Sequence, residues 1–170
     1  RIVMASIGTG GQGKYDTRAL FSLPDVQYVA VCDVDAKHRA DARAMIEEYY
    51  SQQDAGSKGI EEYNDFREVI ARDDIDAVMI APPDHWHGVM SVAAAQAGKD
   101  IYCEKPLANS VPEGRAVVDA VQRYGRVFQT GSHERWAHRQ IAPDPREPAG
   151  GQPRSHRQPT GDADSRGIRL

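Results

Sequence analysis

The stretch from Gly8 to Gly13 constrains the fold more than any other part of this 170-residue chain. It follows the apolar run Ile2–Ile7, which predicts a buried strand, and it precedes a segment with helical spacing. Glycines at 8, 10 and 13 form a G-x-G-x-x-G pattern, which lets a strand turn tightly into a helix. The middle glycine leaves room for a pyrophosphate, and the N-terminus of the helix offers N–H groups to an anion.

A second apolar run, Val26–Cys32, leads into Asp33, about 20 residues after the last glycine of the turn. In dinucleotide sites a carboxylate at this spacing accepts hydrogen bonds from the hydroxyls of the adenosine ribose. It also repels a 2′-phosphate, so the pattern favours NAD over NADP. Asp35 is expected to cap the next helix. The alternatives are an ordinary strand–helix turn and a methyltransferase with a glycine-rich first turn.

Strands and helices alternate along most of the chain. We predict strands at residues 1–7, 26–33, 60–63, 76–81, 100–103 and 127–130, with helices at 11–23, 36–53, from 64 or 65, from 84 or 85 to 98, and 110–125. This alternation predicts an α/β fold with right-handed crossovers and a doubly wound parallel sheet, the Rossmann fold. Ligands of such sheets bind beyond the carboxyl ends of the strands.

Two helices have apolar positions that are expected to form their buried faces. In the first helix these are Ala19, Leu20 and Leu23, and in the helix that ends near residue 98 they are Val89, Met90, Ala93, Ala94 and Ala97.

Charge and hydropathy exclude several classes of function. The net charge of −4 gives no basic surface for nucleic acid, and no apolar run approaches the ~20 residues of a membrane span. Cys32 and Cys103 lack metal-ligand spacing and are expected to be reduced core residues. The pair His85 and His87 does not complete a metal site, so no metal is expected. A cytoplasmic location is the default, and an exported parent protein stays open because the chain begins at Arg1.

The composition changes after Trp136. Residues 137–170 contain no aromatic residue and hold five of the ten prolines, without any periodicity. We therefore expect one domain over residues 1–136, followed by a tail at 137–170 that is disordered or is translated from a shifted reading frame.

Four motifs together resemble the N-terminal half of the glucose–fructose oxidoreductase and inositol 2-dehydrogenase family (Gfo/Idh/MocA). They are the glycine-rich turn, the segment 31–35, the segment 81–87, and Glu104-Lys105-Pro106 after the fifth predicted strand. The resemblance covers residues 1 to 136. It implies a nucleotide-binding domain that pairs with a C-terminal α/β domain, which supplies much of the substrate pocket, an Asp/His pair and the oligomer interface. We expect that second domain to be missing from this sequence.

The resemblance also implies roles for individual residues. Lys105 is the implied catalytic residue, which contacts the substrate hydroxyl and the nicotinamide ribose. The implied cofactor-binding residues are Gly8, Gly10, Gly11, Gln12, Gly13, Asp33, Pro82, His87, Glu104 and Lys105. Trp86 is expected to be a packing residue. Gln129, His133 and Arg135 follow the sixth predicted strand, where the family places residues that face nicotinamide and substrate.

The function implied by the resemblance is that of an NAD-binding domain in an oxidoreductase. The parent protein would pass a hydride from a hydroxyl of a sugar or polyol to nicotinamide, and it would be a homo-oligomer. Turnover by the chain itself is not expected without the second domain. Two alternatives are an inactive dinucleotide-binding fragment and an NAD-dependent glycosidase of the same family.

Overall fold

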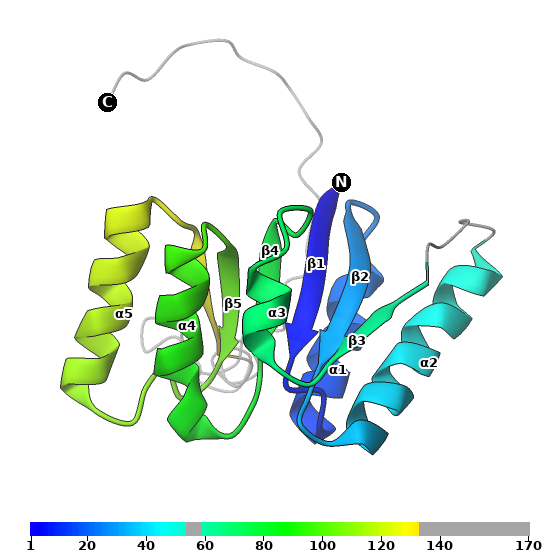
Figure 1. The fold of residues 1–170 in the computed structure, drawn as a ribbon, viewed down its shortest axis with the longest axis horizontal. Coiled ribbons are helices and arrows are strands. Elements are labelled where there is room, and N and C mark those ends of the chain that lie inside the picture. Colours follow the sequence, from blue (N-terminus) through cyan, green and yellow to red (C-terminus); the bar gives the residue numbers. More distant parts are fainter. Residues whose placement is uncertain (54–58, 133–170) are drawn as a thin grey trace, which may run out of the picture. The chain divides into compact units, whose positions relative to one another are not determined.

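The computed structural model describes residues 1–53 and 59–132, all of which lie in one compact unit (Figure 1). The expected domain boundary at residue 136 and the predicted tail at 137–170 lie outside the described residues, as do His133 and Arg135.

Strands and helices alternate through the described residues in the predicted order. The strands are β1 (Ile2–Ile7), β2 (Val26–Cys32), β3 (Glu61–Tyr63), β4 (Ala77–Ile80), β5 (Asp100–Glu104) and β6 (Phe128–Gly131). The helices are α1 (Gly11–Phe21), α2 (Ala36–Gln52), α3 (Phe66–Ile70), the 3₁₀ turn η1 (Asp84–Trp86), α4 (His87–Gln96) and α5 (Val111–Tyr124).

The six strands form one sheet in the order β3-β2-β1-β4-β5-β6, and every neighbouring pair is parallel. This is the doubly wound Rossmann arrangement, so the predicted fold class is confirmed. The chain winds outward from β1 in both directions, and a crevice therefore opens between the carboxyl ends of β1 and β4.

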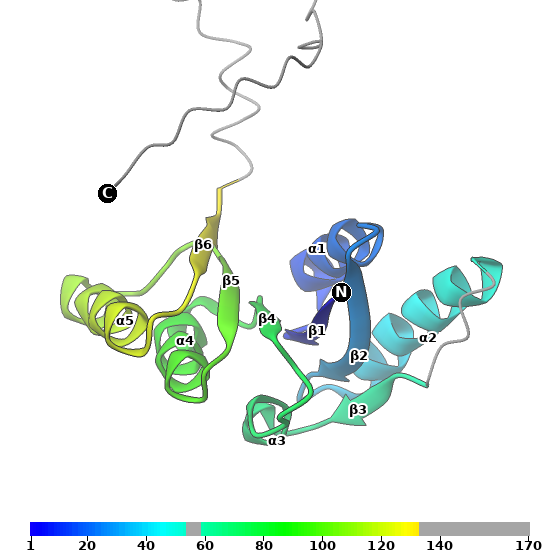
Figure 2. The ribbon, with the colours of Figure 1, turned by 90° about the horizontal axis from the view of Figure 1, so that it is seen from above.

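Helices cover both faces of the sheet. On one face, Phe21 of α1 and Ile46 of α2 pack in a cluster with Met79 of β4. On the other face, α3, α4 and α5 pack against alternate residues of the same strands, such as Ile80 and Ile101. Figure 2 shows α1 on the opposite side of the sheet from α4 and α5. Strands covered on both faces have few polar positions, which explains why they were recognisable as apolar runs.

The buried face of α1 differs from the expected one. Leu23 follows the end of the helix and is 48% exposed, and the buried residues are Gly13, Asp16, Thr17 and Phe21. Thr17 lies over β1, where its hydroxyl is 2.6 Å from that of Ser6, and it donates to the carbonyl oxygen of Gly13. Apolar spacing located only part of this face, because Phe21 packs in the apolar cluster whereas Thr17 is buried through hydrogen bonds.

The predicted apolar face of α4 is also partly wrong. Met90 and Ala94 are buried as expected, but Val89 is 49% exposed and Ala97 is exposed beyond the last helical residue. The α-helix begins only at His87, after η1, and buries His87, Gly88 and Ser91. Because these buried residues are polar or small, a search for apolar spacing does not find them. The apolar pattern therefore assigned exposed residues such as Val89 to the buried face.

The ends of the helices follow local rules. Asp35 caps α2 by accepting the backbone N–H groups of Lys37 and His38, as predicted. Gly125 ends α5 in the left-handed conformation, with φ 62°. None of the described helices combines the length and hydropathy that a membrane span needs.

Both cysteines are free thiols in the core, as expected: Cys32 is 3% exposed and Cys103 is fully buried. Burial raises the pKa of the Cys32 thiol to about 12 and that of Cys103 to about 11, and neighbouring carboxylates act in the same direction.

We therefore expect both thiols of the native chain to resist a disulfide reagent such as dithiobisnitrobenzoate at mildly alkaline pH. A raised pKa keeps the thiol protonated, and the thiolate is the nucleophile. Absorbance of the released thiol measures the reaction, and the same chain unfolded in guanidinium should release two equivalents. Rapid stoichiometric reaction of the folded chain would contradict the burial described.

Candidate nucleotide-binding site

The glycine-rich turn lies at the carboxyl end of β1, directly against the end of β4. Gly8 has φ 85°, and a Cβ placed there would overlap the backbone of Ala81 and Pro82. A Cβ at Gly13 would overlap the carbonyl group of Gly8. These two glycines are therefore required by the protein itself, because backbone occupies the space that a side chain would take.

Gly10 and Gly11 differ from these two glycines. A Cβ at Gly10 would meet only the ring of His38 at ordinary contact distance, and a Cβ at Gly11 would meet nothing within 4 Å. The folded chain does not need glycine at either position. Their missing side chains instead leave the N-terminus of α1 open, with no acidic residue in its first turn. A helix N-terminus of this kind attracts an anion, and a pyrophosphate suits it.

Asp33 follows β2 and turns its carboxylate toward the glycine-rich turn. Oδ2 accepts the backbone N–H of Thr9 at 2.7 Å, and Oδ1 accepts that of Asp35 at 2.9 Å. The side chain is only 12% exposed. Oδ2 also accepts the Thr9 hydroxyl at 3.4 Å, whereas Oδ1 keeps the second of its two acceptor positions. The local fold thus fixes the orientation of the carboxylate and leaves Oδ1 able to accept a ligand hydroxyl.

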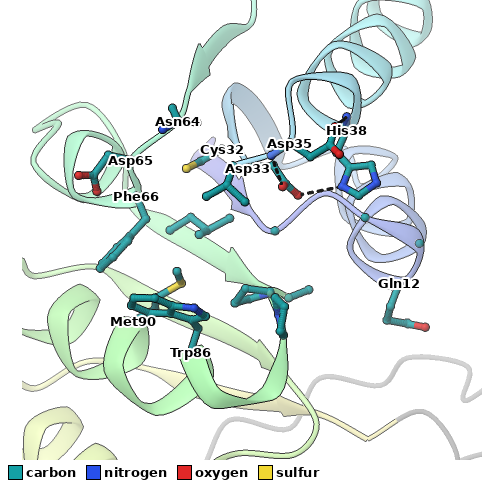
Figure 3. Close-up of a pocket in the computed structure, with 18 of the residues that line it drawn as sticks. Gln12, Cys32, Asp33, Asp35, His38, Asn64, Asp65, Phe66, Trp86 and Met90 are labelled. Atoms are coloured by element: carbon teal, nitrogen blue, oxygen red, sulfur yellow. Dashed lines mark hydrogen bonds and ion pairs between the residues drawn. The ribbon is translucent and has the colours of Figure 1, made fainter.

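These groups line one cavity of about 660 Å³ at the carboxyl ends of β1 to β4, within the size range of cofactor sites. Figure 3 shows Asp33 and His38 in the upper part of this view and Trp86 and Met90 in the lower part. Six of the predicted site residues line it, namely Gly8, Gly10, Gly11, Gln12, Asp33 and Pro82. Gly13 lies beneath the turn and supports it.

One end of the cavity is apolar. Trp86 of η1 packs against Phe66 of α3 with ring centroids 6.4 Å apart, and Met90 lies beside them (Figure 3). Trp86 is therefore a packing residue, as predicted, but at 38% exposure it also presents a ring to the cavity. The guanidinium of Arg67 lies 4.9 Å from the centroid of Phe66. A flat, weakly polar ligand group fits such a surface.

Lys105 and Glu104 are not among the residues that line this cavity. Lys105 is exposed in the segment after β5, and its backbone N–H donates to Oε2 of Glu104 at 3.1 Å. The Glu104 carboxylate is 2% exposed, contacts Gly131 of β6 and receives a hydrogen bond from Tyr102. Burial, together with the carboxylates of Asp16 and Glu104, raises the pKa of Tyr102 to about 12, so its hydroxyl stays a donor.

His87 connects the cavity with the Lys105 segment. The ring is buried at 1% exposure, with Nδ1 2.6 Å from the carbonyl oxygen of Pro106 and Nε2 2.9 Å from that of Pro82. His87 therefore fixes two segments that follow neighbouring strands, and it does not line the cavity. Within residues 1–53 and 59–132, no group of three or more His, Cys, Asp or Glu side chains could hold a metal ion.

Several lining residues were not predicted as site residues. They include Val34, His38, Asn64, Asp65, Phe66, Arg67 and Met90. Asn64 and Asp65 follow β3, and the rule that ligands bind at carboxyl ends of strands would have found them. His38 lies in the first turn of α2, and no sequence signal marks it.

Comparison with known proteins identifies a family. The Gfo/Idh/MocA family, described as an oxidoreductase family with an NAD-binding Rossmann fold, matches residues 2–132. Inositol 2-dehydrogenase of Rubrobacter xylanophilus is 32% identical over 144 residues, which are 84% of this chain and 38% of that protein. The chain therefore spans little more than a third of the length of this relative.

Solved structures agree with this result. An NAD-binding oxidoreductase of Klebsiella pneumoniae is 31% identical with a TM-score of 0.56, over 77% of this chain and 34% of that one. A myo-inositol 2-dehydrogenase of Lactobacillus plantarum has a TM-score of 0.63 at 24% identity, over 82% of this chain and 40% of that one. This second likeness concerns the fold alone.

The two kinds of glycine give a test by substitution. Gly13→Ala should lower the free energy of unfolding by about 2 kcal/mol or more, because the new methyl group overlaps the Gly8 carbonyl group. Gly11→Ala should change it by less than about 1 kcal/mol, because that methyl group has open space. Urea denaturation of both variants makes the comparison, and equal effects would contradict the assignment.

Proposed function

Because the chain belongs to the Gfo/Idh/MocA oxidoreductase family, of which it contains the NAD-binding Rossmann domain, we propose that it is the cofactor-binding part of a sugar or polyol dehydrogenase. The single observation that carries the proposal is the cavity in which Asp33 and the open N-terminus of α1 face the same space. The relative from Rubrobacter xylanophilus, by its name, acts on inositol, and the proposed substrate class extends that chemistry to this chain.

The geometry supports one orientation of the dinucleotide. A pyrophosphate at the N-terminus of α1 is flanked by Asp33 on the β2 side and by the β4 and β5 ends on the other. Asp33 receives the hydroxyls of the adenosine ribose, and the adenine packs at the apolar end beside Phe66 and Trp86. The nicotinamide half then extends toward Pro82 and the Lys105 segment.

Lys105 is proposed as the catalytic residue, on the strength of its place in Glu104-Lys105-Pro106 after β5. NAD supplies the hydride acceptor. When the carbinol C–H bond of the substrate breaks, the hydroxyl proton must also leave so that a carbonyl forms, and a neutral Lys105 amine can take it.

Two neighbours of Lys105 are proposed as positioning residues. Glu104 receives the backbone N–H of Lys105, and His87 holds the carbonyl oxygen of Pro106 against that of Pro82. Both groups are buried, so they fix the backbone around Lys105 without entering the cavity.

The remaining proposals concern the parent protein. It acts on a small molecule rather than on nucleic acid, works as a homo-oligomer and lies in the cytoplasm. Further residues beyond this chain complete its substrate pocket, since the relative from Rubrobacter xylanophilus is more than twice as long.

The cofactor site is tested by calorimetric titration of the chain with NAD and with NADP. Asp33→Asn should raise the Kd for NAD by about tenfold, because a charged acceptor bound to hydroxyls is replaced by a neutral one. It should also reduce the preference for NAD over NADP, because the repulsion of the 2′-phosphate is lost.

Asp35→Asn is the matched control. It removes a carboxylate that lines the same cavity, and asparagine caps a helix as well as aspartate does. We expect this variant to bind NAD nearly as the unchanged chain does. Equal losses in both variants, or no binding of NAD by a chain that melts cooperatively, would contradict the proposed site.

The activity is tested by NADH absorbance with myo-inositol and a panel of sugars and polyols. We expect NADH formation only when the rest of the parent protein is present, and there Lys105→Met should lower kcat by about 100-fold or more with little change in the Kd for NAD. Release of an aglycone without net NADH would instead support a glycosidase.

A further inference from the structure

A histidine with no role in the proposed chemistry lies between the proposed ribose and pyrophosphate positions. His38 lines the cavity, and its Nδ1 is 3.5 Å from Oδ2 of Asp33 (Figure 3). The same ring faces the glycine-rich turn, because a Cβ at Gly10 would lie 3.6 Å from its Cε1. A substituent on the ribose hydroxyl nearest Asp33 therefore lies within reach of this ring.

The charged groups of α1 and α2 around His38 are already paired. Lys14 and Lys37 both contact Oδ2 of Asp41, at 3.1 and 2.8 Å. Asp35 accepts the backbone N–H of His38 and thereby caps the helix. The two lysines are therefore paired with Asp41 rather than with Asp33.

The charged groups on the side of β2 and β3 are paired as well. Arg39 donates to the backbone carbonyl oxygen of Asp33 and to Oδ1 of Asn64, and its Nε is 3.7 Å from Glu62. Nη1 of Arg67 is 3.1 Å from Oδ1 of Asp65, and its guanidinium lies over the ring of Phe66.

We propose that His38 makes the choice between NAD and NADP depend on its protonation. Neutral His38 leaves the Asp33 carboxylate to exclude a 2′-phosphate. The imidazolium form pairs with Asp33 and donates to the phosphate, so it admits NADP. The inference rests on the proposed function, because it takes Asp33 as the ribose acceptor.

Two physical features support this assignment. Histidine is the side chain that changes charge near neutral pH, and a cation placed between two anions removes most of their repulsion. The ring is 46% exposed, so solvent screens the interaction. A charge-assisted hydrogen bond in such a place changes the affinity for NADP by about tenfold, and NAD, which has no 2′-phosphate, should hardly respond.

The experiment measures Kd for NAD and for NADP at about pH 6 and about pH 8, values on either side of the ordinary pKa of histidine side chains in general. The proteins are the unchanged chain, His38→Gln, which is neutral throughout, and His38→Lys, which is cationic throughout. The 2′-phosphate itself titrates near pH 6, and His38→Gln measures that contribution separately.

In the unchanged chain the affinity for NADP relative to NAD should rise by about tenfold toward pH 6. His38→Gln should lose most of this rise, and His38→Lys should bind NADP at about pH 8 as tightly as the unchanged chain does at about pH 6.

The inference is overturned if the affinity for NADP has the same pH dependence in the unchanged chain and in His38→Gln. It is also overturned if His38→Lys gains no affinity for NADP. In both cases, binding of NAD leaves the proposed function intact. If NAD binds to none of the three proteins although all melt cooperatively, the proposed function is overturned and the inference falls with it.

Discussion

At Gly8 the turn after β1 lies against the backbone at the end of β4, and no side chain could stand between them. The same turn is tied to β2, because the N–H of Gly8 donates to the carbonyl oxygen of Cys32 at 2.8 Å. Gly13 then brings α1 down onto the turn. These close backbone contacts fix where the three central strands end, and every part of the cofactor cavity is placed relative to those ends.

The orientation of α1 depends on a polar layer as well as on the apolar packing of Phe21. Thr17 meets Ser6 of β1, and the Ser6 hydroxyl also lies 3.3 Å from that of Tyr28. Burial raises the pKa of Tyr28, so its hydroxyl remains protonated. Asp16 accepts from the side chain of Gln12, which lines the cavity. Hydrogen bonds are directional, so this layer sets the rotation of the helix and aims its N-terminus at the crevice.

The site thus consists of two parts with different physical character. The part proposed to hold a nucleotide is built from backbone, from missing side chains and from one fixed carboxylate, Asp33. The part proposed for chemistry is the exposed Lys105 on a segment whose backbone is held by buried polar groups, with His87 as the connection to the cavity. A rigid attachment of this kind fixes the backbone from which the exposed side chain of the proposed catalytic residue extends.

The sequence by itself determined the alternation of strands and helices, the parallel sheet, the glycine-rich turn and the place of Asp33, because each depends on local periodicity, on backbone freedom or on spacing along the chain. It did not determine the strand order, the polar buried face of α1, the exposure of Val89, or the meeting of His38 with Asp33 and of His87 with Pro106. Those features depend on contacts between segments far apart in the chain. Only the tertiary structure decides them, because a hydrogen bond across the fold leaves no periodic pattern in the sequence.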